Sequence, residues 1–121
     1  MGEQINLSFA DLTGLEGALA GEVLSCAALL AVQATGVSFR GCNMIACLMT
    51  DSILDGADFS NAKLPHTDFS RSSLKNANFR KAFLKAADFE NCDLSGADFR
   101  YAQIEDANFN GANLSGTGLE Q

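Results

Sequence analysis

Large apolar residues recur at every fifth position along most of the chain. Within residues 57–100, phenylalanine and leucine alternate at this spacing. The period fits neither a helix, which repeats every 3.6 residues, nor a flat strand, which repeats every two. A short fixed period indicates a solenoid. The central positions are Phe39, Met44, Met49, Leu54, Phe59, Leu64, Phe69, Leu74, Phe79, Leu84, Phe89, Leu94, Phe99, Ile104, Phe109, Leu114 and Leu119.

Small residues form a second row, two positions before each large one, from Val37 to Thr117. Most of them are Ala, Ser, Thr or Cys. Residues two apart lie on the same side of an extended segment, so both rows are expected to point inward. The other three positions are mostly Asp, Asn, Ser, Gly, Lys and Arg, which suit tight turns. Each five-residue unit is therefore predicted to be a short strand followed by a turn.

The alternation of Phe and Leu predicts a coil with four faces of five residues each. Residues twenty apart would then stack on the same face. Two opposite faces would be filled by phenylalanine and the other two mainly by leucine. The predicted stacks are Phe59, Phe79 and Phe99; Phe69, Phe89 and Phe109; Leu64, Leu84 and Ile104; and Leu54, Leu74, Leu94 and Leu114.

The repeated unit resembles the pentapeptide repeat family, whose motif is Ala-(Asp/Asn)-(Leu/Phe)-x-x. Near-literal copies are Ala57-Asp58-Phe59, Ala77-Asn78-Phe79, Ala87-Asp88-Phe89, Ala97-Asp98-Phe99, Ala107-Asn108-Phe109 and Ala112-Asn113-Leu114. The resemblance covers residues 37–121. It implies an all-β solenoid, a right-handed quadrilateral β-helix of about four coils. Met44 and Met49 depart from the motif, and Phe83 stands where Asp or Asn is usual.

Residues 1–36 are expected to form a partial coil followed by a capping helix, ahead of the β-helix at 37–121. Ala10-Asp11-Leu12 is a good pentapeptide, but its centre is two residues out of register with the later frame, which requires an insertion. Thr13 and Glu16 match a capping box. A helix-spaced apolar stripe follows at Leu15, Ala18, Leu19, Val23, Cys26, Ala27 and Leu30.

These signals favour a helix within residues 14–35. The outward apolar residues Ile45, Leu48 and Ile53 are expected to receive it. The alternative keeps the five-residue step through Leu24 and Leu29 and adds further coils. It would place Glu22 at an inward small position.

The formal net charge of −7 is unevenly distributed. Residues 1–58 carry −6, residues 59–85 carry +5 and residues 86–121 carry −6. This banding is typical of a solvated surface, or of an electrostatic surface patterned for a partner. No charged segment followed by an apolar run opens the chain, and the most apolar stretch, residues 23–34, is too short to span a bilayer. A cytoplasmic protein with reduced thiols is expected.

The sequence predicts no catalytic, cofactor or metal site. Asp58, Asp88 and Asp98 precede central residues and are expected to bond to nearby backbone rather than to catalyse. His66 is expected at the surface, without a recurring acid or nucleophile beside it. The four cysteines contain no closely spaced pair of the kind that zinc sites use.

Two candidate binding surfaces remain. Basic residues share a turn position, with exposed aromatic residues beside them, and form a candidate protein-interaction surface. Its members are Arg40, Arg80, Lys81, Phe83, Arg100 and Tyr101. The last coil would leave inward residues uncovered, which favours a weak homodimer through that end. Those residues are Ile104, Phe109, Leu114 and Leu119.

A non-enzymatic protein-interaction or scaffold module with an unknown protein partner is the favoured function. We expect neither nucleic acid nor a membrane as partner. The resemblance implies an alternative, because the family includes quinolone-resistance proteins that look like DNA and bind DNA gyrase, a type II topoisomerase. Duplex DNA carries one charge per about 1.7 Å, so a rod of about 20 Å would need about twelve negative charges. The net charge is only −7 and is interrupted by a basic belt, so DNA mimicry is the less favoured of the two functions.

Overall fold

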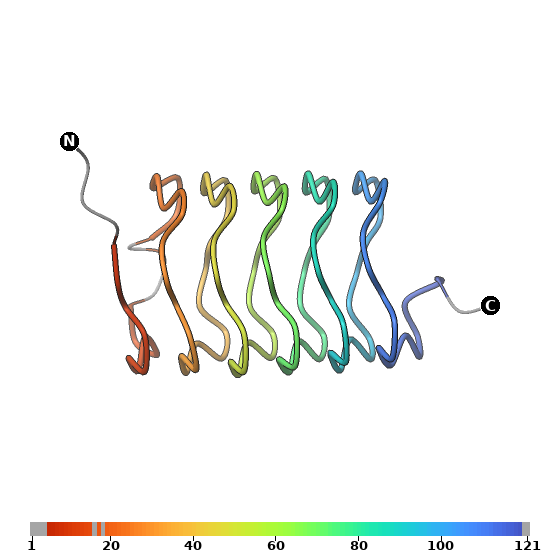
Figure 1. The fold of residues 1–121 in the computed structure, drawn as a ribbon, viewed down its shortest axis with the longest axis horizontal. Helices are drawn as coiled ribbons and strands as arrows, with labels where there is room; N and C mark the ends of the chain where they lie inside the picture. Colours follow the sequence, from red (N-terminus) through yellow and green to blue (C-terminus); the bar gives the residue numbers. More distant parts are fainter. Residues whose placement is uncertain (1–4, 16, 18, 120–121) are drawn as a thin grey trace.

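The chain winds into one four-sided solenoid, whose coils stack in a straight row (Figure 1). The computed structural model describes residues 5–15, 17 and 19–119. In these residues there is no helix, and each extended segment contributes a single bridging residue between two turns. The sheets on the four faces are therefore built from isolated parallel bridges. The name of each face is taken here from one inward residue: Phe59, Leu64, Phe69 or Leu74, in chain order.

The register between coils is constant along most of the solenoid. From the bridge between Val23 and Asn43 to that between Asp93 and Asn113, every pair is twenty residues apart. In the first coil, Asn6 pairs with Ala28, so the spacing there is 22 residues. Two extra residues therefore lie between the first coil and the later frame, which confirms the offset predicted from the sequence.

The pentapeptide from Ala57 to Asn61 shows how the backbone is satisfied. Three of its N–H groups bond to carbonyls of neighbouring coils, one closes the preceding turn, and one bonds to a side chain. The pairs are Asp58 to Val37, Phe59 to Asn78, Asn61 to Arg80, Ala57 to Leu54, and Ser60 to the Asp58 carboxylate. Buried backbone groups need such partners, so the repeated pattern makes each coil a template for the next.

Two columns of phenylalanine rings run through the core, beside buried leucine and methionine side chains. Rings twenty residues apart lie nearly parallel, with centroids 4.9 to 5.2 Å apart. Rings from the two opposite faces meet edge to face, with centroids 5.4 to 5.9 Å apart. Both arrangements are favourable for aromatic pairs. The stacks are Phe39, Phe59, Phe79 and Phe99, and Phe69, Phe89 and Phe109, which confirms the predicted assignment.

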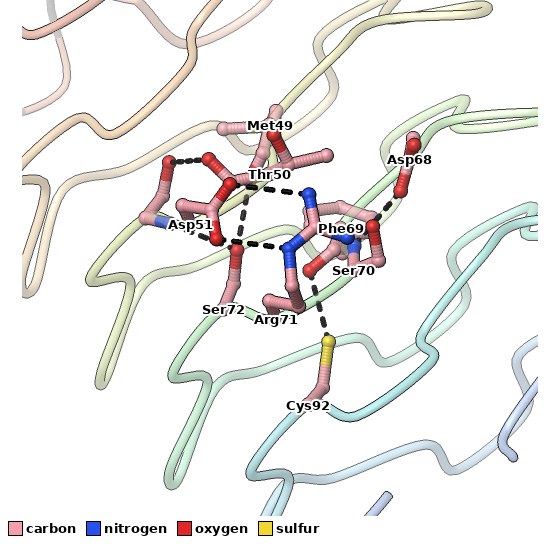
Figure 2. Close-up of polar contacts among 10 residues, drawn as sticks. Met49, Thr50, Asp51, Asp68, Phe69, Ser70, Arg71, Ser72 and Cys92 are labelled. Carbon is pink, nitrogen blue, oxygen red and sulfur yellow. Dashed lines mark hydrogen bonds and ion pairs between the residues drawn. The ribbon is translucent and has the colours of Figure 1, made fainter. Parts of the chain in front are cut away.

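Polar side chains in the row of small inward residues donate hydrogen bonds to backbone carbonyls of the preceding coil. The Ser72 hydroxyl donates to the Met49 carbonyl at 2.8 Å, and the Cys92 thiol donates to the Phe69 carbonyl at 2.9 Å (Figure 2). In both cases the acceptor lies 23 residues earlier. Burial raises the pKa of Cys92 to about 12 and that of Cys47 to about 11, so both thiols are protonated at neutral pH.

The predicted helix within residues 14–35 is wrong, because the coil continues through this segment. Leu24 and Leu29 are buried, and their N–H groups bond to carbonyls of the next coil. Val23, which the helical stripe would have buried, is 64% exposed. Gly17 and Gly21 have positive φ and lie in turns. Glu16 of the capping box lies outside the described residues.

Inter-coil hydrogen bonds explain why the five-residue step replaces the helix. A helix would satisfy its own backbone and leave the edge of the following coil unpaired. The coil instead supplies carbonyls, such as that of Glu22, to which the Asn43 N–H bonds. Glu22 itself is exposed rather than inward, at the point where the register changes. Ile45, Leu48 and Ile53 receive no helix and are 39 to 40% exposed on the outside of the solenoid.

We expect Phe79→Ala to lower the free energy of unfolding by about 3–5 kcal/mol, because it removes a ring buried between two stacked neighbours. Tyr101→Ala is the matched control: Tyr101 is 75% exposed, and the change should stay within about 0.5 kcal/mol. Urea unfolding followed by circular dichroism measures both values. Equal losses in the two variants would contradict the inward assignment.

Candidate protein-interaction face

The structure brings the predicted interaction residues together on one side of the solenoid. Arg40, Arg80 and Arg100 occupy the same position at the corner between the Phe59 and Leu64 faces. Arg80 lies two coils after Arg40, and Arg100 lies one coil after Arg80. Lys81 and Tyr101 follow at that corner and are exposed. Phe83 points outward from the Leu64 face, where it is half-buried rather than fully exposed.

Two lysines that the sequence analysis left out belong to the same surface. Lys63 forms a parallel bridge with Phe83, and Lys85 lies at the next corner, immediately after Leu84. Six of the eight basic residues of the chain therefore gather on the Leu64 face and its two corners. We call this surface the basic face: Arg40, Lys63, Arg80, Lys81, Lys85 and Arg100.

Most of the basic residues thus form a stripe along one side of the rod, while the basic segment itself, residues 59–85, also places Arg71 and Lys75 on the opposite side. The stripe follows from the twenty-residue register, which superimposes residues 63 and 83 and separates residue 75 from residue 85 by half a coil. When the sequence is written in rows of twenty residues, the basic residues of the stripe fall in neighbouring columns. The net charges of sequence segments conceal the stripe, because each segment contributes residues to all four faces.

The two remaining basic residues lie at the corners of the opposite, Leu74 face, and each is paired. Arg71 and Asp51 interact with Nε–Oδ1 and Nη2–Oδ2 distances of 3.0 and 3.2 Å (Figure 2). The hydrogen bond from Arg71 lowers the pKa of Asp51. Lys75 Nζ lies 3.9 Å from Asp93 Oδ2. The opposite side therefore offers little unbalanced positive charge.

One carboxylate neutralises part of the basic face. Asp98 Oδ2 lies 2.8 Å from Arg100 Nη2 and 3.9 Å from Arg80 Nε. The hydrogen bond from Arg100 is the largest of the effects that lower the pKa of Asp98 to about 2. Within the described residues, Arg40, Lys63, Lys81 and Lys85 form no ion pair. These four charges are therefore not neutralised by a neighbouring carboxylate in the described residues.

A shallow depression of about 200 Å³ lies at the corner of the basic face. Guanidinium, ammonium, amide and hydroxyl groups line it, so it is rich in hydrogen-bond donors. Its lining residues are Arg40, Ser60, Asn61, Asn78, Arg80 and Lys81. Such a site suits a carboxylate or another small anionic group.

The residues considered for catalysis have structural roles. Asp58, Asp88 and Asp98 each accept the backbone N–H of the residue two positions later, at 2.9 to 3.0 Å. This confirms the prediction that they bond to nearby backbone and stabilise turns. His66 is exposed in a turn, as predicted. Across the described residues, no group of three or more His, Cys, Asp or Glu side chains is placed to hold a metal ion.

A second depression, of about 520 Å³, lies at the C-terminal end of the described solenoid. Ile104, Phe109, Leu114 and Leu119 line it and are half-buried, whereas the same rows are fully buried in the middle coils. The four residues predicted for a dimer end are therefore brought together. In the part of the chain that the structure describes, no helix is long and apolar enough to cross a membrane.

Comparison with known proteins supports the assignment of the repeat. A sequence model described as pentapeptide repeats, in eight copies, matches residues 52–91 and 84–116. No curated protein is significantly similar to the chain in sequence.

Solved structures share the fold at low sequence identity. A pentapeptide repeat protein from the thylakoid lumen of Arabidopsis thaliana is 24% identical, with a TM-score of 0.82 over 87% of this chain and 73% of that one. Rfr23 from the cyanobacterium Cyanothece 51142 is 17% identical, with a TM-score of 0.76 over 90% and 83%. These likenesses show the fold alone, a right-handed quadrilateral β-helix.

HetL from Nostoc sp. strain PCC 7120, a pentapeptide repeat protein involved in heterocyst differentiation regulation, is 26% identical with a TM-score of 0.64. The match covers 98% of this chain and 59% of HetL. QnrB1, a plasmid-mediated fluoroquinolone resistance protein, is 20% identical with a TM-score of 0.53, over 93% of this chain and 72% of that one.

Proposed function

This chain belongs to the pentapeptide repeat family, and on that premise we propose that it is a non-enzymatic protein-interaction or scaffold module that binds its partner through the basic face. The observation that carries the proposal is the gathering of six of eight basic residues on one side of a protein with a net charge of −7. A random arrangement would spread them over all four faces. Complementary charge of this kind steers association and selects partners.

The rigidity of the solenoid supports a binding role. The side chains of the basic face project from backbone that is hydrogen-bonded to the coils before and after it, as in the pairs Lys63 N–H to Cys42 and Lys81 N–H to Arg100. A partner that binds such a surface does not have to order the backbone, so less conformational entropy is lost on binding.

The absence of an enzymatic role is inferred from how the polar groups are used. The recurring carboxylates already accept backbone N–H groups, and the depressions on the described surface are shallow. Enzyme sites are usually deeper, mostly apolar clefts with a few convergent polar groups.

DNA mimicry toward gyrase is the second candidate, and one observation favours it. Because most basic residues lie on the Leu64 face and its corners, acidic residues can follow one another in successive coils of another face, as Asp68 and Asp88 do on the Phe69 face. The low identity to QnrB1 shows only a shared fold. Pairing of Asp51 and Asp93 with basic residues further dilutes the negative potential.

The test of the proposed function compares two double charge reversals. Lys81→Glu with Lys85→Glu alters the basic face, and Arg71→Glu with Lys75→Glu alters the opposite face. The two pairs have the same spacing and the same positions within their pentapeptides, and Arg71 and Lys81 share a φ of 61°. The net charge changes equally in both.

We expect the parent and the Arg71/Lys75 variant to capture the same proteins from a lysate. The Lys81/Lys85 variant should fail to capture them. Affinity capture with quantitative mass spectrometry gives the comparison. Equal capture by the parent and by both variants would place the binding surface elsewhere. If the parent inhibits DNA supercoiling by gyrase and the Lys81/Lys85 variant retains this inhibition, DNA mimicry would be favoured instead.

We also propose that two copies associate weakly through the C-terminal coil. The apolar side chains that line the end depression can be buried by a second copy, and two-fold symmetry would close the contact. Each such side chain contributes about 1.5–3 kcal/mol when fully buried. One coil end offers an area near the lower limit for specific association, which is why the dimer is expected to be weak.

Leu114→Asp with Leu119→Asp should convert this dimer to a monomer, because it places two charges in the apolar contact. Sedimentation equilibrium over a range of concentrations measures the change. The control is Gln103→Glu, whose exposed side chain points outward from the Leu64 face beside Phe83 and should leave the dimer intact. A parent protein that remains monomeric at high concentration would rule out the proposal.

A further inference from the structure

We propose that the basic face binds a short acidic polypeptide segment of about five residues, which lies along the solenoid axis beside Phe83. This inference rests on the proposed function and specifies the chemistry of its partner. It is argued from three properties of the surface: charges without partners, the length of the positive stretch, and the carboxylates that bound it.

The charges without ion-pair partners are spread across the Leu64 face from one corner to the other. Lys81 lies at one corner of the Leu64 face and Lys85 at the other, within one coil, while Lys63 stands between the corners in the preceding coil. None of the three forms an ion pair within the described residues. Carboxylates of a segment on this face would therefore be met by ammonium groups from both sides, without displacing an existing partner.

The length of the positive stretch sets the length of the segment. Arg40 and Arg100 are three coils apart in register, which corresponds to about 14 Å at about 4.8 Å per coil. An extended polypeptide advances about 3.3 Å per residue, so four or five residues span this distance. The depression that Arg40, Arg80 and Lys81 line can receive one of their carboxylates.

Aromatic side chains add an apolar contact at the middle of the surface. Phe83 is half-buried on the Leu64 face, and Tyr101 is 75% exposed at the adjacent corner, one coil later. Aromatic residues surrounded by charged ones are typical of binding hot spots. An apolar residue at the centre of the acidic segment would pack against them.

Carboxylates at both ends of the stretch disfavour a longer polyanion. Glu22 lies one coil ahead of it, and Glu105 and Asp106 lie in the same coil as Arg100, at the opposite corner of the Leu64 face, which Lys85 occupies in the preceding coil. All three are exposed. A nucleic acid that ran along the axis would extend past the cationic stretch at both ends and meet these groups, whereas a five-residue segment would end at the coil of Arg100 and could stay at the Arg100 corner, away from Glu105 and Asp106. A polypeptide segment is therefore the occupant that the charge pattern favours.

The experiment is a titration of the isotopically labelled protein, followed by nuclear magnetic resonance at low salt. The probe is the peptide Glu-Glu-Leu-Glu-Glu. The matched probe Gln-Gln-Leu-Gln-Gln has the same length and no side-chain charge, and a thymidine pentanucleotide tests nucleic acid. The protein variants are the Lys81/Lys85 and Arg71/Lys75 double charge reversals, each first shown to melt as the parent does.

We expect the Glu peptide to bind at least about tenfold more tightly than the Gln peptide, with shifts centred on Lys81, Phe83 and Lys85. The Lys81/Lys85 variant should lose about tenfold in affinity, and the Arg71/Lys75 variant should change by less than about twofold. Equal binding of the two peptides, equal losses in both variants, or tighter binding of the oligonucleotide would each overturn the inference.

Failure of this inference can be separated from failure of the proposed function. If the Glu peptide does not bind while capture of proteins still depends on Lys81 and Lys85, the acidic segment is wrong and the basic face remains the binding surface. If capture does not depend on these lysines either, the proposed function fails as well.

Discussion

The backbone hydrogen bonds between successive coils are the constraint on which the rest of the structure depends. Each extended segment is a single bridging residue, so no strand is long enough to be stable by itself. Stability comes from repetition, because every coil satisfies the backbone of the coil before it and presents the same groups to the next. A shift of register by even one residue would break these bonds and turn the inward side chains outward.

The same register determines both the core and the surface. It stacks Phe59 on Phe79 in the interior, and it superimposes Lys63 and Phe83 on the exterior. Core packing therefore holds the outward columns in place, and charges far apart in the sequence become neighbours. A surface of this kind is specified by spacing along the chain and requires no separate structural element to position it.

Most of the fold could be predicted from the sequence, because the five-residue period is read directly from the large apolar residues. The prediction from the period failed only within residues 14–35, where the apolar residues fit both a coil and a helix. Leu24 and Leu29 fit the coil, but Val23 and Leu30 also completed a helical stripe, and local spacing cannot decide between them. The decision is made by non-local hydrogen bonds, such as that from Leu29 N–H to the Leu48 carbonyl.

The candidate site was only partly predictable for a related reason. The shared turn position of Arg80 and Arg100 was visible in the sequence. Lys63 precedes its central residue, and Lys85 follows a central residue of the next face, so both join the surface only through the fold around Phe83. Which charges stay unpaired also depends on side-chain geometry. Arg71 and Asp51 are twenty residues apart and so lie in one column, but only the side-chain geometry shows that they pair.

The register itself is the central claim, and backbone nuclear Overhauser contacts test it most directly. The account predicts contacts between residues twenty apart, such as Lys63 with Phe83 and Val23 with Asn43, and a spacing of 22 between Asn6 and Ala28. Contacts between residues three and four apart throughout residues 14–35, with none from Val23 to Asn43, would contradict the continuous coil.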